Sequence, residues 1–379
     1  MTTLVVAALS ARMMAECAAR DGFDVVALDL FGDQDTRRVS SRWLPIGTKG
    51  RLRIEPARLL DALAQLASRG EVLGWLPGAG FEAEPELLEQ GAALLPLLGT
   101  APIDVRRVRD PVQFFGVLDR HDIAHPPVCN VAPVDALDAE RWLLKDSRGT
   151  GGWHVRRSAP GSAAPNHHYH QREVAGMPMS ASFIANGRDV GVLGCNEMIV
   201  RRAGPHPYVF CGIVGPVSLP VQTCRDIERA VRLISAEFGL RGLCGMDFMC
   251  DTGRMQVLEV NPRPGSSMAL YAQGCLPHGL MSAHVRACVH RELVPPPPDA
   301  LTVRGMQIVF ARGALRLDEN AARHLARWPD AHDLPHAGEC FVAGDPLCSL
   351  AAEGDDAMMV RTQLARGCEA LLDSLEGLS

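Results

Sequence analysis

The chain has 379 residues, of which 47% are hydrophobic and 22% are charged, and its formal net charge is -6. This length and composition indicate a globular protein of roughly two to four modules and exclude wholesale disorder. The negative charge, without any dense run of Lys or Arg, argues against a nucleic-acid partner, and no apolar stretch is long enough to span a membrane.

The cysteines and the first segment bear on the cellular compartment. The twelve cysteines include no Cys-x-x-Cys pair, which indicates free thiols in a reducing cytoplasm. The first segment has an apolar run without a basic region before it, so we expect a strand there and not a signal peptide. We therefore expect a soluble, cytoplasmic protein.

Residues 1–103 are predicted to form a small, doubly wound α/β domain. Apolar runs at 3–9 and 24–30 flank a helix that Ser10 can cap and Gly22 can end. This order is typical of a parallel β-α-β unit.

A second helix, over residues 55–70, leads to a third apolar run that ends in the loop PGAGFE, residues 77–82. Ligands of such sheets bind beyond the carboxyl ends of the strands. Asp29, Asp33 and the loop 77–82 occupy these positions, so Asp29 is a weak candidate for a substrate contact.

Residues 104–295 show a different order of predicted helices and strands from residues 1–103. A helix closed by a double proline, over 110–127, gives way to short strands and glycine turns up to about residue 215, which indicates an antiparallel patch. An amphipathic helix over 225–240 then precedes two strands joined by the turn DTGR, residues 251–254.

The proline-rich segment 294–300 is predicted to be a stiff linker. Residues 296–379 are then expected to form a smaller C-terminal domain of short strands with one terminal helix over 353–375.

Three possible zinc ligands, His332, His336 and Cys340, follow one another at four-residue spacing in this last region. A turn through Pro335 and Gly338 explains the segment without a metal, and we prefer that interpretation.

The strand before residue 262 carries polar residues at alternate positions. Glu259 and Asn261 share one face, about 7 Å apart along the chain given roughly 3.3 Å per residue, and Arg263 can follow on the same side. If residues 251–254 close an antiparallel hairpin, Asp247 lies opposite or diagonal to Glu259. Carboxylates that close repel each other unless a cation lies between them, and an all-oxygen ligand set suits Mg²⁺ or Mn²⁺.

This metal site predicts a nucleotide phosphate nearby, because magnesium completes its coordination shell with phosphate oxygens and water. Arg263 could hold the transferred phosphoryl group or a substrate carboxylate. Ser266 and Ser267 follow it and offer hydroxyl groups to a ligand. The alternative is a solvent-facing polar strand in which Arg263 pairs with one of the acids.

Residues 141–157 contain an apolar strand that ends in Lys145, a glycine loop and a second strand. Backbone N–H groups of Gly149, Gly151 and Gly152 can approach phosphates closely, while Lys145 neutralises charge. No Gly-Lys-Ser/Thr occurs, so this is not a P-loop. The alternative is a surface hairpin with a solvated lysine.

Residues 169–194 are predicted to form three short strands, with Asn-Gly as the turn between the second and third. Gln171 and Glu173 lie on one face of the first strand. Such a strand edge could hydrogen-bond an adenine.

Taken in order, four elements resemble the ATP-grasp superfamily: the lysine with its glycine flap, the pattern Q-x-x-x-x-G-x-x-x-S, the strand GMDFM and the segment LEVNPRPGSS. The resemblance covers residues 1 to about 295. It implies an N-terminal α/β domain followed by two α+β subdomains that clamp ATP, one of them a glycine-flap subdomain at about 128–175.

The resemblance also implies site residues. It makes Asp247, Glu259 and Asn261 ligands of Mg²⁺ or Mn²⁺, Lys145 and the flap glycines contacts of the ATP phosphates, and Arg263 the arginine near the transferred phosphate. It places Gln171, with Glu173 nearby, against the adenine. Weaker candidates for substrate contacts are Ser182, Ser266, Ser267 and Asp29.

The chain departs from the family pattern at two places. Many members carry a lysine after the aspartate that precedes the first clamp helix, but here Asp110 is followed by Pro111. That phosphate contact is missing or comes from Arg106, Arg107 or Arg109. In addition, the first loop, within AALSARMMA, lacks the usual glycines.

Two further resemblances concern the ends of the chain. The segment 333–354 is similar to the C-terminal domain of biotin-carboxylase-like ATP-grasp enzymes, which makes a homodimer the expectation. The segments 28–38, 78–88 and 109–115, together with the Q-to-S segment at 171–180, resemble ATP-grasp ligases of tetrahydromethanopterin-linked one-carbon metabolism, which are related to tyramine–glutamate ligase of methanofuran assembly.

The leading functional hypothesis is a ligase that uses ATP to phosphorylate a small carboxylate and joins the acyl phosphate to an amine, with release of ADP and phosphate. A second hypothesis keeps ATP and makes bicarbonate the acceptor. A third, motivated by Pro111 and the glycine-poor first loop, is a nucleotide-binding regulatory protein with weak turnover.

Overall fold

The computed structural model describes residues 2–377, except 49, 51, 69, 83 and 295–301. The predicted linker over 294–300 therefore lies almost wholly outside the described residues. Within them, no helix is long and apolar enough to cross a membrane. All twelve cysteines lie in the described part of the chain and carry free thiols, as predicted.

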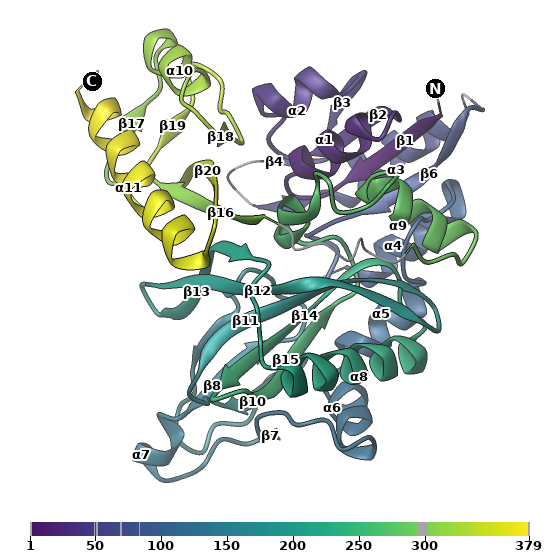
Figure 1. Ribbon diagram of the computed structural model, residues 1–379, viewed down its shortest axis with the longest axis vertical. Helices are drawn as coiled ribbons and strands as arrows, with labels where there is room; N and C mark the ends of the chain where they lie inside the picture. The colour runs from purple at the N-terminus through teal and green to yellow at the C-terminus, as the bar shows by residue number, and fades with distance from the viewer. Residues whose placement is uncertain are drawn as a thin grey trace.

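The first domain is a parallel sheet in the order β3-β2-β1-β6 with helices packed around it (Figure 1). Its strands are β1 (Thr3–Ala7), β2 (Asp24–Asp29), β3 (Arg42–Pro45) and β6 (Val72–Pro77), with a small β4–β5 pair (Gly47–Thr48 and Arg53–Ile54). Its helices are α1 (Arg12–Arg20), α2 (Gln34–Val39), α3 (Pro56–Ala67) and α4 (Pro85–Leu94). The predicted doubly wound α/β domain is confirmed.

The start of α1 differs from the prediction. Ser10 does not cap this helix, because the N-cap residue is Ala11 and no side chain caps it. The backbone N–H of Ala11 instead donates to the carboxylate of Asp29, over 3.0 Å. An acid from the end of β2 thus satisfies a helix-start N–H that a local hydroxyl was expected to serve.

Helices α5 (Pro102–Arg109) and α6 (Pro111–Arg120) lead into a small antiparallel sheet in the order β7-β10-β8-β9. Its elements are β7 (Val128–Cys129), α7 (Ala136–Ala139), β8 (Trp142–Asp146), β9 (Val155–Arg157) and β10 (His168–Arg172). The glycine loop joins β8 to β9. This sheet lies within residues 128–175, where the flap subdomain is predicted, and the bounds of that subdomain remain a proposal.

A long antiparallel sheet in the order β15-β14-β11-β12-β13-β16-β20-β18 forms the centre of the molecule (Figure 1). Its strands are β11 (Met177–Asn186), β12 (Val190–Ala203), β13 (His206–Gly215), β14 (Arg241–Asp251), β15 (Arg254–Asn261), β16 (Val303–Phe310), β18 (Ala331–His332) and β20 (Pro346–Gly354). The helical elements between its strands are α8 (Val221–Phe238), η2 (Ser266–Tyr271), α9 (Leu280–Val289) and α10 (Glu319–Ala326).

The C-terminal region continues this sheet. Strand β16 pairs with β13 on one side and with β20 on the other, and the long helix α11 (Ala357–Glu376) packs along them (Figure 1). A separate pair, β17 (Leu315–Arg316) and β19 (Cys340–Phe341), completes the region. The terminal helix occurs where it was predicted, whereas the shared sheet was not visible in the sequence. The boundary at 295/296 remains a proposal, as does the one at 103/104.

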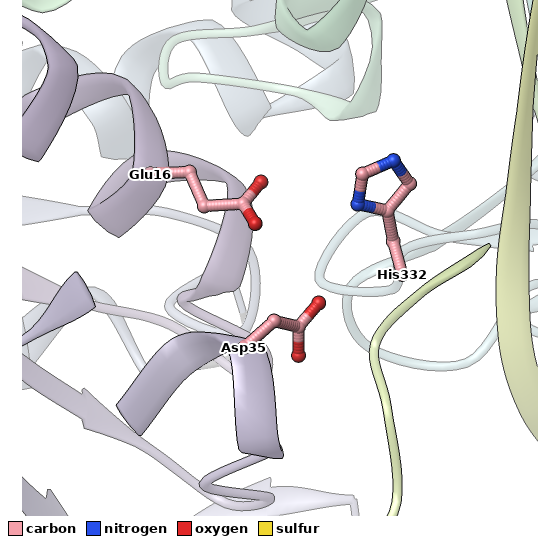
Figure 2. A group of neighbouring side chains, drawn as sticks. All are labelled: Glu16, Asp35 and His332. Atoms are coloured by element: carbon pink, nitrogen blue, oxygen red, sulfur yellow. The ribbon is translucent and has the colours of Figure 1, made fainter. Parts of the chain in front are cut away.

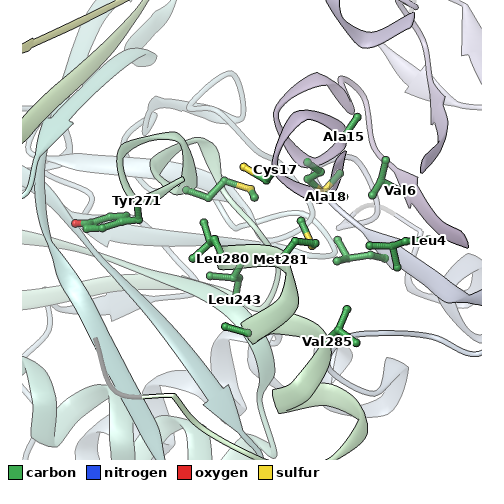
Figure 3. Close-up of a cluster of buried hydrophobic side chains, with 14 of the residues drawn as sticks. Leu4, Val6, Ala15, Cys17, Ala18, Leu243, Tyr271, Leu280, Met281 and Val285 are labelled. Carbon is green, nitrogen blue, oxygen red and sulfur yellow. The ribbon is translucent and has the colours of Figure 1, made fainter. Parts of the chain in front are cut away.

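One hydrophobic core joins the first domain to the central sheet. Figure 3 shows β1 and α1 contributing residues such as Leu4, Val6 and Cys17, which pack towards η2 and α9. From the other side, Tyr271 and Met281 enter the same cluster, and both are at most 1% exposed. Burial of this apolar area packs the first domain against η2 and α9, and Glu82, in the loop after β6, contacts Arg263 just beyond β15.

Candidate functional site

The hairpin of β14 and β15 places the three predicted metal ligands side by side. Its antiparallel register sets Asp247 directly opposite Glu259, as predicted, and Asn261 opposite Gly245. The amide Nδ2 of Asn261 lies 3.2 Å from Oδ2 of Asp247 and 3.5 Å from Oε1 of Glu259. We call Asp247, Glu259 and Asn261 the hairpin site; their polar groups lie within hydrogen-bond distance because cross-strand partners and alternate residues of a strand share one face.

The two carboxyl groups of the hairpin site affect each other's ionisation. Burial and, second, the charge of Glu259 raise the pKa of Asp247 to about 7. Burial alone would also raise the pKa of Glu259, but Arg109, Lys145 and His154 lower it to about 2. Near pH 7, Asp247 is therefore partly protonated, and a bound cation would displace that proton.

Lys145 and Gln171 lie on neighbouring strands of the flap sheet. Lys145 is the last residue but one of β8 and is 7% exposed, and its Nζ donates a hydrogen bond to Oε1 of Gln171 on β10, over 3.1 Å. The Nε2 group of Gln171 is buried and has no hydrogen-bond partner among the described residues. A buried amide without a partner is costly, so this N–H is free to donate to a ligand.

His154 is a site residue that the sequence did not indicate. It follows the glycine loop, and its Nδ1 is buried without a hydrogen-bond partner within the described residues. Burial lowers the pKa of His154 to about 4, against the attraction of Glu259. The ring is therefore neutral at pH 7. A single histidine after a glycine loop gives no sequence signal, so only the fold shows its position.

The glycine loop packs against β13. Gly152 has φ +79°, and a Cβ atom there would lie 1.9 Å from the carbonyl oxygen of Tyr208. Gly151 also has a positive φ, +65°, but a Cβ atom there would meet only the Trp153 side chain, at 3.6 Å. At Gly149 a Cβ atom would collide with His154. Close packing thus requires glycine at 149 and 152, whatever the loop binds.

Arg109, at the end of α5, ties the glycine loop to the hairpin site. Its Nε donates to the carbonyl oxygen of Ser147 and its Nη2 to that of Gly149, both over 2.9 Å. Its Nη1 lies 3.7 Å from Oε2 of Glu259, and the side chain is 8% exposed. A guanidinium therefore stands beside the acids at the place where the family pattern lacks its lysine.

The other two candidate arginines point elsewhere. Arg106 pairs with Glu86 and Glu89 of α4, at 3.6 and 2.8 Å. Arg107 pairs with Asp104 over 2.9 Å. Neither has an ion pair with the hairpin site among the described residues. The sequence offered the three arginines as alternatives because their spacing along α5 alone does not show which one faces the loop.

Arg263 connects three segments of the chain. Its Nε donates to Oε1 of Glu82, which ends the loop after β6 in the first domain. Its Nη2 lies 3.1 Å from the hydroxyl of Thr150 in the glycine loop and 3.5 Å from Oδ1 of Asn261. Arg263 thus lies where the first domain, the flap and the hairpin site meet.

Glu82 was not singled out in the sequence. It is 6% exposed, and Arg263, followed by Arg109, lowers its pKa although burial opposes this. The available signal was its position just beyond the carboxyl end of a parallel strand, where ligands of such sheets bind. That signal also selects many residues that have no such contact.

The serines suggested as substrate contacts lie in two different environments. The Ser182 hydroxyl donates to Ser267 over 2.7 Å and accepts from Nδ2 of the fully buried Asn196 over 3.1 Å. Ser266 is exposed. Ser182 therefore belongs to a buried hydrogen-bond network, while Ser266 and Ser267 begin η2, close after Arg263. Substrate contacts by these serines remain predictions.

Glu173 and Asp29 are engaged by protein groups. The carboxylate of Glu173 accepts from both terminal nitrogens of Arg157 and from the hydroxyl of Tyr208. Asp29 is completely buried, and its oxygens accept from Trp43 and from backbone N–H groups of its own loop and of Ala11. These hydrogen bonds indicate a structural role for Glu173 and Asp29, and we do not propose either as a ligand contact.

The three spaced residues near the C-terminus do not converge. The Nε2 atom of His336 lies 2.8 Å from the carbonyl oxygen of Gly32, and Cys340 is exposed in β19. His332 instead faces Glu16 and Asp35 of the first domain. The turn interpretation of this segment is therefore the better one.

A small cavity of about 20 Å³ opens beside the hairpin site and is lined by residues that include Arg109, Tyr169 and Glu259. A larger and more open pocket, of about 710 Å³, lies between the end of α1 and the loop before α9, lined by residues such as Asp21 and His278. No predicted site residue lines the larger pocket. The position of Arg109, Lys145 and Glu259, not pocket size, therefore locates the candidate site.

Comparison with known proteins identifies the central part of the chain. Residues 108–267 match the family model described as ATP-grasp domain. This stretch contains the flap sheet, the glycine loop and the hairpin site.

Curated relatives share part of this chain at low identity. The carbamoyl phosphate synthase large chain of Halomonas eurihalina is 23% identical over 260 residues, which are 60% of this chain and 24% of that protein. The corresponding protein of Micrococcus luteus is 27% identical over 237 residues, 56% of this chain and 21% of that one. The match thus spans about a quarter or less of these relatives' length.

Solved structures cover almost the whole chain. A biotin carboxylase from Campylobacter jejuni superposes with a TM-score of 0.71 at 12% identity, covering 99% of this chain and 95% of that one. A carboxyaminoimidazole ribonucleotide synthase from Aspergillus clavatus in complex with ATP gives 0.69 at 15% identity, covering 99% of both chains. These likenesses establish the fold, and the predicted ATP-grasp architecture is confirmed.

Proposed function

We propose that this chain, which carries an ATP-grasp domain, is an ATP-dependent ligase that activates a small carboxylate and joins it to an amine. The observation that carries the proposal is the convergence at the hairpin site: Asp247, Glu259 and Asn261 lie together, with Arg109 on one side and Arg263 on the other. Acidic oxygens between cations are the arrangement that a metal–phosphate group requires.

The hairpin site fits Mg²⁺ or Mn²⁺. Its donors are all oxygens, which hard cations prefer. The raised pKa of Asp247 reflects burial and the nearby Glu259, a repulsion that a dication would relieve. Asp247, Glu259 and Asn261 would hold the ion, which when bound neutralises charge on the phosphates of ATP.

The flap sheet supplies contacts for ATP. Lys145 is a buried cation whose charge, like that of Arg109, lowers the pKa of Glu259, and such a cation suits a polyphosphate. Nε2 of Gln171 is a buried donor without a partner, which suits a base. The cavity beside Glu259 is about 20 Å³, whereas nucleotide pockets measure several hundred Å³. That cavity by itself is too small for a nucleotide.

Arg109 takes the role of the missing family lysine in this proposal. Its guanidinium already binds the carbonyl oxygens of Ser147 and Gly149, so it sets the position of the loop that covers the phosphates. Its Nη1, 3.7 Å from Glu259, remains near enough to contact a phosphate oxygen at the metal.

Arg263 and Glu82 form the acceptor side of the site. A carboxylate oxygen of the substrate attacks the γ-phosphorus of ATP, the bond to ADP breaks, and an acyl phosphate forms. The amine nitrogen then attacks the acyl carbon, phosphate leaves and the nitrogen loses a proton. Arg263 orients the carboxylate and its phosphate, and Glu82 fixes the guanidinium by its bond to Nε.

The proposal also concerns which substrates the ligase uses. Loop segments such as 28–38 and 109–115 resemble ligases of methanofuran-type one-carbon metabolism, which makes tyramine and amino acids the first amines to test. A homodimer also remains a prediction, to be checked by light scattering on the purified chain.

The test is release of ADP from Mg-ATP by the purified chain, against single and paired carboxylates and amines, with mass detection of products. ADP release that needs one carboxylate and one amine, with an amide product, would support the ligase. Clear Mg-ATP binding without substrate-dependent release across the panel would favour the regulatory alternative with weak turnover.

Bicarbonate use is the second candidate. It is favoured by the likeness of almost the whole chain to biotin carboxylase. A second structure also favours it: the biotin carboxylase domain of a 2-oxoglutarate carboxylase from Hydrogenobacter thermophilus, in complex with MgADP, ADP and bicarbonate. That domain superposes with a TM-score of 0.66 at 13% identity, covering 93% of this chain and 86% of that one. If this reading is right, ADP release will depend on added bicarbonate in degassed buffer and no other carboxylate will be needed.

A further inference from the structure

A second group of metal-binding side chains lies apart from the hairpin site, where the first domain meets the C-terminal region. It consists of Glu16 on α1, Asp35 on α2 and His332 on β18, and one ligand atom of each lies within 4.8 Å of the others. Figure 2 shows the three side chains pointing towards a common space from three separate segments. We call these three residues the interdomain cluster.

The surroundings of the interdomain cluster carry unbalanced negative charge. Glu16, Asp35 and the neighbouring Asp333 are three carboxylates, and within the described residues Arg12 is the one cationic side chain paired with them apart from any charge on His332. Three negative charges against one guanidinium leave a deficit of positive charge. Such a deficit at partly buried acids is costly unless a further cation binds.

Arg12 does not fill that deficit at Asp35. Its Nε and Nη2 both donate to Asp333, at 2.9 and 3.1 Å, and its Nη1 donates to Oε2 of Glu16 at 3.0 Å. Asp35 is 1% exposed and lies 3.8 Å from Nε, beyond hydrogen-bond distance. Among the residues that the structure describes, no cation is therefore hydrogen-bonded to this nearly buried carboxylate.

Asp35 is nevertheless held firmly in place. Its Oδ2 accepts from the backbone N–H of Asp333 at 2.8 Å and its Oδ1 from that of Leu334 at 3.1 Å. Each carboxylate oxygen keeps a second lone pair, so these bonds orient the group without using up its capacity. Hydrogen bonds that fix a ligating carboxylate are typical of the surroundings of metal sites.

His332 supplies the donor that distinguishes this cluster. No hydrogen bond or ion pair of its ring occurs among the described residues, so the imidazole nitrogen that lies near Glu16 and Asp35 is open to a metal. Ligand atoms around one tetrahedral ion, with metal bonds of about 2.0–2.2 Å, lie about 3.3–3.6 Å apart. The three ligand atoms lie within 4.8 Å of one another, so they need to approach one another by up to about 1.5 Å.

We propose that Glu16, Asp35 and His332 bind a transition-metal dication, Zn²⁺ or Mn²⁺, which joins the first domain to the C-terminal region. Two carboxylates and one imidazole suit such ions better than Mg²⁺, which prefers oxygen ligands alone. Water completes the coordination. The site is independent of the proposed ATP chemistry, since none of its residues belongs to the hairpin site.

The test uses the full chain, stripped with a chelator, dialysed against Zn²⁺ or Mn²⁺ alone without nucleotide, and assayed for bound metal by mass spectrometry. We expect about one ion per chain and a melting temperature about 5 °C higher with metal in hundredfold excess over Kd. In His332→Ala and Glu16→Gln, bound metal should fall to about a tenth or less. Circular dichroism checks that each variant folds.

Two matched variants make the result specific. His336→Ala removes a histidine four residues away whose ring contacts a backbone carbonyl, and Glu259→Gln removes an acid of the hairpin site. Both should retain the ion. The proposal is overturned if the wild type binds no ion, if His332→Ala and Glu16→Gln bind as much as wild type, or if Glu259→Gln alone loses it. Co²⁺ spectra give a second readout, since loss of the imidazole ligand alters the absorption bands.

Discussion

The hairpin site and the interdomain cluster both gather acids, but they differ in what surrounds those acids. At the hairpin site, the charges of Arg109, Lys145 and Arg263 act on the two carboxyl groups and lower their pKa values against the effect of burial. At the interdomain cluster, one guanidinium serves three carboxylates and an imidazole stands opposite. Cations around acids prepare a site for a metal that arrives with an anionic ligand, whereas a deficit of cations favours a metal on its own.

Replacing Glu259 by Gln tests whether the hairpin site binds a metal together with ATP, and it should have the largest effect on activity. We expect substrate-dependent ADP release to fall at least about a hundredfold, because the metal loses a charged ligand. The melting temperature without ligand should stay near that of wild type, and Mg-ATP should no longer raise it. The control is Asp251→Asn, an exposed acid on the same hairpin. A Glu259→Gln protein still stabilised by Mg-ATP would show that the metal lies elsewhere.

Replacing Arg263 by Lys keeps the charge and removes the planar fork that contacts Glu82 and Thr150. We expect kcat/KM for the carboxylate substrate to fall about tenfold to a hundredfold through lost orientation, with Mg-ATP binding unchanged. Steady-state kinetics with each substrate varied in turn would measure this. Unchanged kinetics, or weakened Mg-ATP binding with normal carboxylate kinetics, would remove Arg263 from the acceptor side.

Arg109→Ala and Arg106→Ala form a matched pair on one helix. Arg109 binds the glycine loop and stands 3.7 Å from Glu259, while Arg106 pairs with surface acids. The KM for ATP should rise about tenfold in the first variant, as expected for loss of charge-assisted hydrogen bonds, and stay unchanged in the second. If the two variants had the same KM for ATP, Arg109 would not replace the lysine of the family pattern.

The smallest effect concerns pH and Asp247. Because burial and Glu259 raise its pKa from 3.8 to about 7, the folded protein holds a proton that the unfolded chain releases at lower pH. This group's contribution to stability therefore falls as pH rises from about 4 to about 7. Without ligand, Asp247→Asn should melt about 2 °C above wild type at pH 8 and equal it near pH 4. A variant less stable than wild type at pH 8 would contradict the raised pKa.

Much of the hairpin site could be predicted because its residues are close in sequence. A short turn fixes the register of β14 and β15, so the alternation of side chains places Asp247 opposite Glu259 without reference to the rest of the fold. Asp29 shows the limit of such reasoning: it lies at the carboxyl end of a strand, as predicted, yet its own loop and Trp43 use its oxygens.

The sequence by itself determined the elements whose signals are local: the parallel first domain, the glycine loop and the acids of the hairpin, since periodicity and turn chemistry act over a few residues. Only the tertiary structure decided which arginine faces the loop, that Glu82 reaches Arg263, that β16 joins the central sheet, and that Glu16 meets His332. These contacts join segments up to some three hundred residues apart, and packing of the whole core, which no local pattern encodes, sets them.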